Sequence, residues 1–343
     1  MSSPEIAHEP ESSQIILQTL TGEWITQAVS VAATLGIADL LANGPKDVGD
    51  LAAAASAHAD SLYRLLRALA SVGIFAETED GRFASTPLAE CLRSDASNSM
   101  RNLARMWGMP FFRRPWGELL HCVKTGETGM KRALGATDPF AYFSEHSDES
   151  KVFNGAMTDL SRNTGPAIAE AYDFGKFRKI VDAGGGHGML LTCILRRYPG
   201  PRGIVFDLPK VVNGALPTIE AANLTDRCET VAGNLFESVP AGADAYIMRA
   251  IIHAFDKKRA QAILKNVRRA ITPNGRLLLV DFVVPSGNGP SLSKLGDLHM
   301  LVMAGGRERT PNEFEDLLGA AGFKLSGIHP TESAQSIVEG VPA

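Results

Sequence analysis

The segment Asp182–Gly188, with the sequence DAGGGHG, combines residue types and spacing that are suited to ligand chemistry. It follows a short apolar run, residues 179–181, that predicts a buried strand, and it precedes residues 189–195, which predict a helix. Strand, glycine loop and helix form the unit of open α/β sheets that cradles a nucleotide. Glycines let a ligand approach the backbone closely, because no Cβ stands in the way.

The spacing of the glycines decides which ligand this loop suits. A dinucleotide site needs G-x-G-x-x-G, but the frame from Gly184 and Gly186 places Met189 at the third glycine. The pattern that fits is an acidic residue, one spacer and G-x-G-x-G, which is typical of S-adenosylmethionine (SAM) sites. SAM carries a positive charge and no phosphate, so its site needs a backbone that the ligand can approach closely and a nearby carboxylate. We therefore expect Asp182, Gly184, Gly186 and Gly188 to bind SAM, and the spacing argues against a nicotinamide oxidoreductase.

Two polar residues at the ends of the next predicted strands complete a possible adenosine site. Asp207 ends the strand 203–207, where a carboxylate can accept hydrogen bonds from both ribose hydroxyls. Its alternative role is to cap the helix that follows. Asn234 comes directly after the strand 228–232 and can face the adenine amino group, or it can serve as a turn residue.

Three further residues have the chemistry of an acid–base site. His253 follows the strand 244–248, and ligands of open α/β sheets lie at the carboxyl ends of strands, although a lone histidine is often structural. Asp281 lies in the apolar strand 276–283, where burial is costly without a partner, so we expect it to pair with His253. Glu308 lies in the polar segment Gly305–Thr310, either beside the base or capping the helix that begins at Pro311.

The elements that must position these residues alternate between strand and helix from residue 176 onward. Alternation of this kind predicts parallel βαβ units and a doubly wound α/β sheet, Rossmann-like and seven-stranded. Helices are expected at 257–271 and 311–321, and the last strands, 323–325 and 336–338, are expected to close the sheet as an antiparallel pair. Residues 176–343 are therefore predicted to form the SAM-binding catalytic domain.

The first part of the chain predicts a separate helical domain, residues 1–96. A long helix over 13–42 is followed by helices at 48–55 and 60–72, with Asp60 as N-cap, and by a hairpin of 74–76 with 82–84. Helix, helix and hairpin form a winged helix. Residues 97–175 are predicted to be helical and rich in aromatic residues and methionine, which indicates a linker that contributes a pocket wall. We expect an acceptor pocket that includes Trp107, Met157, His299 and Met303.

Composition and charge limit the classes of function. The 343 residues are 45% hydrophobic and 21% charged, as in soluble globular proteins. The first hundred residues hold five basic and thirteen acidic side chains, a net charge of −8, so the remainder carries +4. A winged helix with a net negative charge binds nucleic acid poorly, because the phosphates must be neutralised by lysine and arginine. The charge therefore argues against a DNA-binding regulator. Four scattered cysteines, a polar N-terminus and an interrupted apolar stretch at 15–41 predict a cytoplasmic protein without a membrane segment.

In combination these segments resemble the plant caffeate-type and the bacterial polyketide and phenazine O-methyltransferases. The resemblance covers nearly the whole chain in order and rests on the glycine loop, Phe206–Pro209, Gly233–Phe236, the His253 segment and GGRERT at 305–310. It implies a SAM-dependent methyltransferase without a metal, which releases S-adenosylhomocysteine and dimerises through its N-terminal domain. It implies that His253 is the general base, flanked by Asp281 and Glu308. The residues implied to contact SAM further include Asp207, Leu208, Asn234, Leu235 and Arg249.

Some positions depart from the family pattern and keep alternatives open. Ala254 stands where the family usually has an aspartate after the base, and Phe255 stands in place of tryptophan. Asn234 replaces an acidic residue, although its amide oxygen can still accept from an adenine amino group. The main hypothesis is methyl transfer to a hydroxyl, which we expect to be phenolic, of a small aromatic or polyketide-like metabolite. C-methylation, for which His253 and His299 could bind a metal, and SAM-assisted hydroxylation are the alternatives within the same fold.

Overall fold

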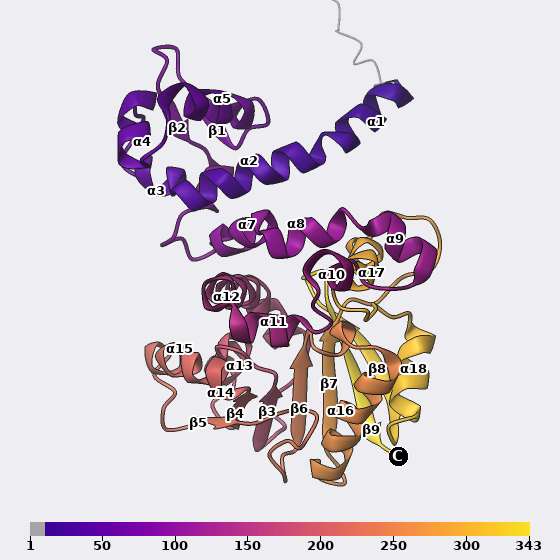
Figure 1. Cartoon of the computed structure of the whole chain (residues 1–343). Coiled ribbons are helices and arrows are strands. Elements are labelled where there is room, and N and C mark those ends of the chain that lie inside the picture. Colours follow the sequence, from indigo (N-terminus) through magenta and orange to yellow (C-terminus); the bar gives the residue numbers. More distant parts are fainter. Residues whose placement is uncertain (1–10) are drawn as a thin grey trace, which may run out of the picture. The chain divides into compact units, whose positions relative to one another are not determined.

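The described residues, 11–343, fall into two units in this computed structural model, one up to Met109 and one from Pro110 to Ala343 (Figure 1). Residues 97–109 therefore group with the N-terminal unit, and 110–175 group with the C-terminal unit. Among residues 11–343, no helix is long and apolar enough to cross a membrane.

The N-terminal unit contains the predicted winged helix. Its helices and strands are α1 Ser12–Leu20, α2 Gly22–Leu35, α3 Ile37–Leu40, α4 Val48–Ala54, α5 Ala59–Ala70, β1 Phe75–Glu77, β2 Phe83–Ser85, α6 Pro87–Glu90 and α7 Arg101–Gly108. β1 and β2 pair as an antiparallel hairpin after α4 and α5, which confirms the order helix, helix, hairpin.

Two details of the N-terminal unit were predicted wrongly. The long helix over 13–42 is three helices, because the chain turns at Thr21 and again at Gly36, whose φ of +69° ends α2 in the left-handed conformation. The N-cap of α5 is His58 and not Asp60, since the His58 Nδ1 atom accepts a hydrogen bond from the Ser61 amide.

The C-terminal unit is built on one seven-stranded sheet. Its strands are β3 Lys179–Ala183, β4 Arg202–Asp207, β5 Cys228–Ala232, β6 Ala245–Arg249, β7 Arg276–Asp281, β8 Phe323–Pro330 and β9 Ser336–Pro342. They lie in the order β5-β4-β3-β6-β7-β9-β8, and only the pairings that involve β9 are antiparallel. The predicted mostly parallel sheet and its closing antiparallel pair are confirmed. The last strand, β9, is inserted between β7 and β8.

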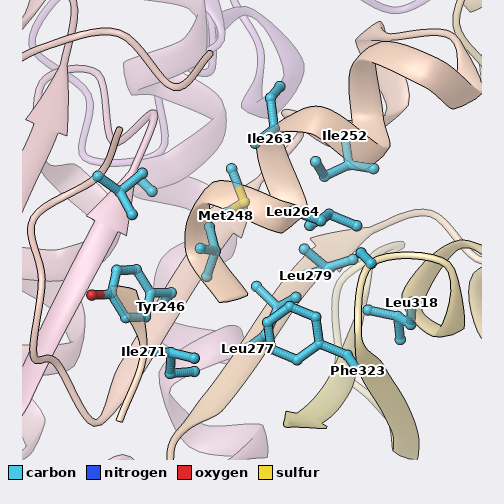
Figure 2. Close-up of a cluster of buried hydrophobic side chains, with 14 of the residues drawn as sticks. Tyr246, Met248, Ile252, Ile263, Leu264, Ile271, Leu277, Leu279, Leu318 and Phe323 are labelled. Carbon is cyan, nitrogen blue, oxygen red and sulfur yellow. The ribbon is translucent and has the colours of Figure 1, made fainter. Parts of the chain in front are cut away.

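Helices cover both faces of this sheet, which is why its parallel strands are almost continuously apolar (Figure 1). One face packs on α16 Lys257–Ala270 and α18 Pro311–Gly319, with Leu264, Phe314 and Leu318 among the buried contacts. Figure 2 shows this cluster, in which Ile252 lies near Leu264. The opposite face packs on α12 Ser147–Ala171, α13 Met189–Arg197 and α15 Leu216–Ala221.

The remaining elements connect the sheet to shorter helices. They are α8 Pro110–Trp116, α9 Leu119–Thr125, α10 Gly129–Leu134, α11 Pro139–Glu145, α14 Pro209–Val212, η1 Asn213–Ala215, η2 Ile252–Ala254 and α17 Leu292–Met303. The chain order reverses between β3 and β6, since β4 and β5 lie to one side of β3, and β6 and β7 lie to the other. In open α/β sheets a ligand binds beyond the carboxyl ends of the strands at such a switch point.

Candidate active site

A cavity of about 460 Å³ lies at the switch point, beyond the carboxyl ends of β3, β4 and β6. This volume is within the range of small-molecule sites. The strand ends and the glycine loop form one wall, and α11, α12 and the start of α14 form the other. The lining residues used below are Phe140, Phe143, Phe153, Met157, Ser161, Asp182, Gly184, Gly186, His187, Asp207, Leu208, Lys210, Arg249 and Ile251.

The glycine loop needs its glycines for two different reasons. Gly184, Gly186 and Gly188 have φ angles of +81°, +57° and +72°, which side chains rarely adopt. At Gly184 a Cβ would also lie 2.4 Å from the end of the Ile251 side chain, which would have to move to make room for it. Gly188 is the N-cap of α13 and is absent from the cavity lining, so it shapes the loop behind the site.

Two carboxylates give the cavity its electrostatic character. Asp182 is buried, and its Oδ2 atom has no hydrogen-bond partner among the described residues. Burial and the charge of Asp207 raise the pKa of Asp182 to about 7. A buried oxygen without a partner beside a second carboxylate would be relieved by a positively charged ligand. The cavity therefore fits a cationic nucleoside such as SAM.

Asp207 is held by the glycine loop rather than by a helix cap. Its two oxygens accept hydrogen bonds from the amides of Gly186, at 2.8 Å, and Leu208, at 2.7 Å. Each carboxylate oxygen retains a second lone pair, so these bonds leave acceptor capacity for a ligand hydroxyl. Burial raises the pKa of Asp207 above its ordinary value.

Arg249 connects the cofactor cavity with the predicted acid–base residues. Its guanidinium donates to Ser161 Oγ and to Gln335 Oε1, both at 2.9 Å. Burial lowers the pKa of Arg249, while the charges of Asp182 and Asp281 raise it. The residue thus lies between the two buried aspartates and compensates part of their charge.

Besides Gly188, two other residues expected to contact the cofactor lie outside the cavity lining. Asn234 accepts a hydrogen bond from the Phe236 amide at 3.0 Å and donates to Glu237, which is the geometry of a turn. Leu235 lies beside the glycine loop, 3.6 Å from the position that a Gly184 Cβ would take. Their contact with a ligand stays a prediction.

His253, two residues along the chain from the cavity-lining Ile251, pairs with the buried Glu308. The His253 Nδ1 atom lies 2.6 Å from Glu308 Oε1, with 15% and 1% of the two side chains exposed. Burial by itself lowers the pKa of His253, but the hydrogen bond and charge of Glu308, together with Asp281, raise it above its ordinary value. Thr310 and Glu313 form the capping box of α18, so Glu308 has no part in that cap.

The predicted pairing of Asp281 with His253 is wrong as a hydrogen bond. Both Asp281 oxygens are buried without a partner among residues 11–343, and burial raises the pKa of Asp281 to about 7. The carboxylate that hydrogen-bonds the imidazole is that of Glu308, 55 residues along the chain from His253. Asp281 therefore acts on His253 through its charge alone. Ala254 has no polar side chain, so the imidazole is oriented by Glu308 and not by the residue after it.

The residues expected to form an acceptor pocket are distributed over several elements. Met157 lines the cavity, whereas His299 and Met303 lie in α17 and Trp107 lies in α7 of the N-terminal unit. His299 Nδ1 accepts a hydrogen bond from Trp116 Nε1 at 3.0 Å. Burial and the charge of His253 lower the pKa of His299 to about 4, so this ring stays neutral.

Among the cavity-lining residues that the sequence did not predict are His187 and Lys210. His187 lies inside the glycine loop, and its Nδ1 atom contacts Thr158 Oγ1 at 2.9 Å, linking the loop to α12. Its position between two glycines was a usable signal. Lys210 donates to the Ser144 carbonyl of α11 at 3.4 Å, a contact that spacing alone does not reveal.

Comparison with known families agrees with this arrangement. The family model described as the O-methyltransferase domain matches residues 116–324, and the model of the O-methyltransferase dimerisation domain matches residues 17–95. The chain is 46% identical to the phenazine O-methyltransferase PhzM of Lysobacter antibioticus over 330 residues, which cover 96% of each chain.

Solved structures show the same similarity in three dimensions. The crystal structure of LaPhzM matches with a TM-score of 0.93 at 45% identity, over 96% of this chain and 99% of that chain. NcsB1, an O-methyltransferase from neocarzinostatin biosynthesis, matches with a TM-score of 0.79 at 32% identity, over 95% of this chain and 98% of that chain. That structure contains S-adenosylhomocysteine and 1,4-dihydroxy-2-naphthoic acid. With its sheet order, its glycine loop and these matches, the chain belongs to the O-methyltransferase family and is a SAM-dependent O-methyltransferase.

Proposed function

We propose that the enzyme methylates a phenolic hydroxyl of a small, flat aromatic metabolite and that His253 is the general base. The observation that carries this proposal is the 2.6 Å contact between His253 Nδ1 and Glu308 Oε1. His253 lies two residues along the chain from Ile251, which lines the cavity. When bound, SAM supplies a methyl group on a sulfonium, which needs no acid or metal to leave. The protein must then align the acceptor oxygen and remove its proton.

Glu308 determines which nitrogen of His253 is the base. A carboxylate that accepts from Nδ1–H leaves the lone pair on Nε2, so Nε2 is the atom that can take the proton of the acceptor hydroxyl. A phenol has a pKa of about 10, whereas an imidazole near 6.5 is largely free to take its proton at neutral pH. The raised pKa of His253 makes the ring a stronger base, and Glu308 stabilises the cation that forms.

The cofactor role is assigned to the glycine loop, Asp182, Asp207 and Arg249. Asp182 has a buried oxygen without a hydrogen-bond partner in the described part of the chain, which suits the positive charge of the cofactor. Asp207 has lone pairs left to accept from ribose hydroxyls. Arg249 interacts electrostatically with both buried aspartates, Asp182 on the cofactor side and Asp281 on the base side.

Aromatic side chains support the choice of a flat acceptor. Phe140, Phe143, Phe153 and Met157 line the cavity from α11 and α12. In α8 and α17, Phe112 stacks on His299 with ring planes 12° apart, and Trp116 stacks on it with planes 20° apart. The relatives named above act on a phenazine or bind a naphthoic acid, ring systems of the same shape.

A labelling experiment tests the proposed reaction. The protein is incubated with methyl-labelled SAM and with phenols, matched aromatic amines and matched methyl ethers that lack a free hydroxyl. We expect a gain of one methyl that depends on the free hydroxyl and is located on oxygen by NMR. Methyl on ring carbon would support C-methylation, and a gain of oxygen would support SAM-assisted hydroxylation; either result overturns the proposal.

Asp207→Ala is expected to weaken SAM binding about 10- to 100-fold, the range for a hydrogen bond to a charged group. The variant removes both the ribose acceptor and the anchor of the Gly186 amide. Asp244→Ala is the matched control, since Asp244 accepts from the amides of Arg178 and Lys179 at the opposite end of the strands. Calorimetric titration with SAM measures both; equal loss in the two variants would point to general destabilisation instead.

We also propose that the N-terminal unit forms a homodimer, in line with the dimerisation-domain match. In α1 and α2 a run of apolar side chains is exposed, with 70% of Leu20 and 72% of Trp24 accessible. An apolar surface of this kind is typical of a protein interface. We expect Trp24→Asp to shift the dimer toward monomer in multi-angle light scattering. Leu216→Asp, at an exposed leucine in α15, should leave the mass unchanged.

A cytoplasmic location stays a proposal, supported by the four free cysteines Cys91, Cys122, Cys193 and Cys228.

A further inference from the structure

Arg309 is a buried cation whose guanidinium donates hydrogen bonds to backbone carbonyls on both sides of His253. Only 3% of the residue is exposed. Its Nη1 atom donates to the carbonyl oxygens of Ile252 and Arg307, both at 3.2 Å, and its Nη2 atom donates to the Phe255 carbonyl at 3.3 Å. The two carbonyls of Ile252 and Phe255 bracket His253, so one guanidinium spans the turn that carries the base.

The turn that carries His253 has few internal hydrogen bonds, so contacts with other segments must stabilise it. His253 lies in the three-residue 3-10 turn η2, and the amides of Ala254 and Phe255 make hydrogen bonds of 3.2 and 3.3 Å within it. Short 3-10 turns have poor hydrogen-bond geometry. Ile252 and Phe255 are 0% and 5% exposed and anchor the turn in the core, where Figure 2 shows Ile252.

The residues before Arg309 hold the same turn through its other groups. The Arg307 amide donates to the His253 carbonyl at 2.9 Å, while Glu308 binds the imidazole. At Gly306 a Cβ would lie 1.9 Å from that carbonyl, so only glycine allows this approach. The segment itself is fixed, because the Val284 amide donates to the Arg309 carbonyl at 2.9 Å just beyond β7.

We propose that Arg309 is a positioning residue for methyl transfer: its guanidinium locks the Ile252–Phe255 turn so that His253 meets both Glu308 and the acceptor hydroxyl. This inference rests on the proposed role of His253 as the base. It assigns the second arginine of GGRERT to orientation of the base, and Gly306 to the close approach that makes such orientation possible.

The charge of Arg309 gives the proposal a second, independent readout. The charged or titratable groups that act on His253 are Glu308 in the same segment, Asp281 at the end of β7, His299 in α17 and Arg309. Arg309 opposes the carboxylates and lowers the pKa of His253. Loss of that positive charge therefore raises the pKa of His253. Because the base must be neutral, activity should be lost on acidification at a higher pH than in the wild type.

Three variants separate orientation from charge. In Arg309→Met both the fork of donors and the charge are lost, and in Arg309→Lys the charge is kept without the fork. The control is Arg227→Met, since Arg227 donates in the same way to the carbonyls of Leu195, Tyr198, Pro199 and Pro201. For each, kcat, the KM for the acceptor, the Kd for SAM and the pH dependence of kcat are measured, and NMR of the imidazole nitrogens follows the titration of His253.

For Arg309→Met we expect kcat to fall about 10²-fold, the usual cost of a small misplacement of a catalytic group, with the Kd for SAM unchanged. The acid limb of its pH profile and the NMR titration of His253 should both move to higher pH. Arg309→Lys should lower kcat but keep the wild-type limb. Arg227→Met should change neither kcat nor the limb.

Wild-type kcat and a wild-type pH profile in Arg309→Met would overturn the proposal, as would a loss of kcat without movement of the acid limb. If Arg309→Met does not fold, Arg309→Lys decides the matter, because wild-type kcat in that variant shows that the fork of donors is dispensable. Failure of the base assignment is a separate result, since it would appear as turnover by His253→Ala, whatever Arg309 does.

Discussion

Replacing His253 by alanine is expected to lower kcat about 10³-fold, within the range that general acid–base catalysis contributes. The imidazole is the only base that the proposed reaction uses, and Glu308, which remains in the variant, has no access to the acceptor because 1% of its side chain is exposed. His253 is absent from the lining of the cofactor cavity, so the Kd for SAM should stay within about twofold of the wild type.

His329→Ala is the matched control for this variant. His329 also pairs with a glutamate, Glu339 on β9, at 3.1 Å between Nε2 and Oε2, but it lies in β8 away from the cavity. Turnover is read from single-turnover methyl transfer and SAM binding from calorimetry. Near-normal turnover in His253→Ala would remove the histidine from the mechanism, and equal losses in both variants would indicate damage to the fold.

The parts of the site that the sequence predicted are those set by local spacing. The glycine loop follows its strand within two residues, so the run of glycines after Asp182 predicts strand, loop and helix without knowledge of the rest of the fold. Asp207 ends a buried strand, and the topology of a doubly wound sheet brings the carboxyl ends of β3, β4 and β6 together. Arg249, at the end of β6, was implied by the family resemblance and not by spacing.

The partners of His253 could not be predicted in the same way. Asp281 and Glu308 are both acids of suitable type, and spacing gives no measure of which one reaches the ring. The structure decides in favour of Glu308, because the segment 306–309 follows the turn closely, which a Cβ at Gly306 would prevent. The contribution of Arg309 was missed for a related reason, since carbonyl acceptors can belong to any residue and leave no pattern in the sequence.

The predicted helix boundaries were wrong at positions where a single residue ends or caps a helix. The apolar stripe over 13–42 continues through Thr21 and Gly36, so periodicity alone predicts one helix. Gly36 has the left-handed φ that ends α2, and the stripe resumes in α3. At α5, His58 accepts from the Ser61 amide in place of Asp60, a capping role that histidine takes less often than aspartate.

Glu308→Gln is expected to lower kcat about 10²-fold and to move the acid limb of the pH profile to lower pH. Burial lowers the pKa of His253, and the hydrogen bond and charge of Glu308 raise it above its ordinary value. The base must be neutral to accept a proton, so wild-type activity is lost as the pH falls through that raised pKa. Glutamine keeps an acceptor for Nδ1–H but removes the charge, so the pKa of His253 drops and the plateau of kcat falls because the cation is less stabilised.

Asp281→Asn distinguishes the hydrogen bond from the charge. Asp281 acts on His253 through charge alone, so its variant should move the limb in the same direction by a smaller amount. Its plateau of kcat should fall less than in Glu308→Gln, because Glu308 still holds the ring at 2.6 Å. The measurement is kcat against pH at saturating SAM and acceptor, with His253 titrated by NMR in parallel. A limb that stays in place or moves to higher pH in Glu308→Gln would contradict the assignment, since removal of a neighbouring negative charge can only favour the neutral imidazole.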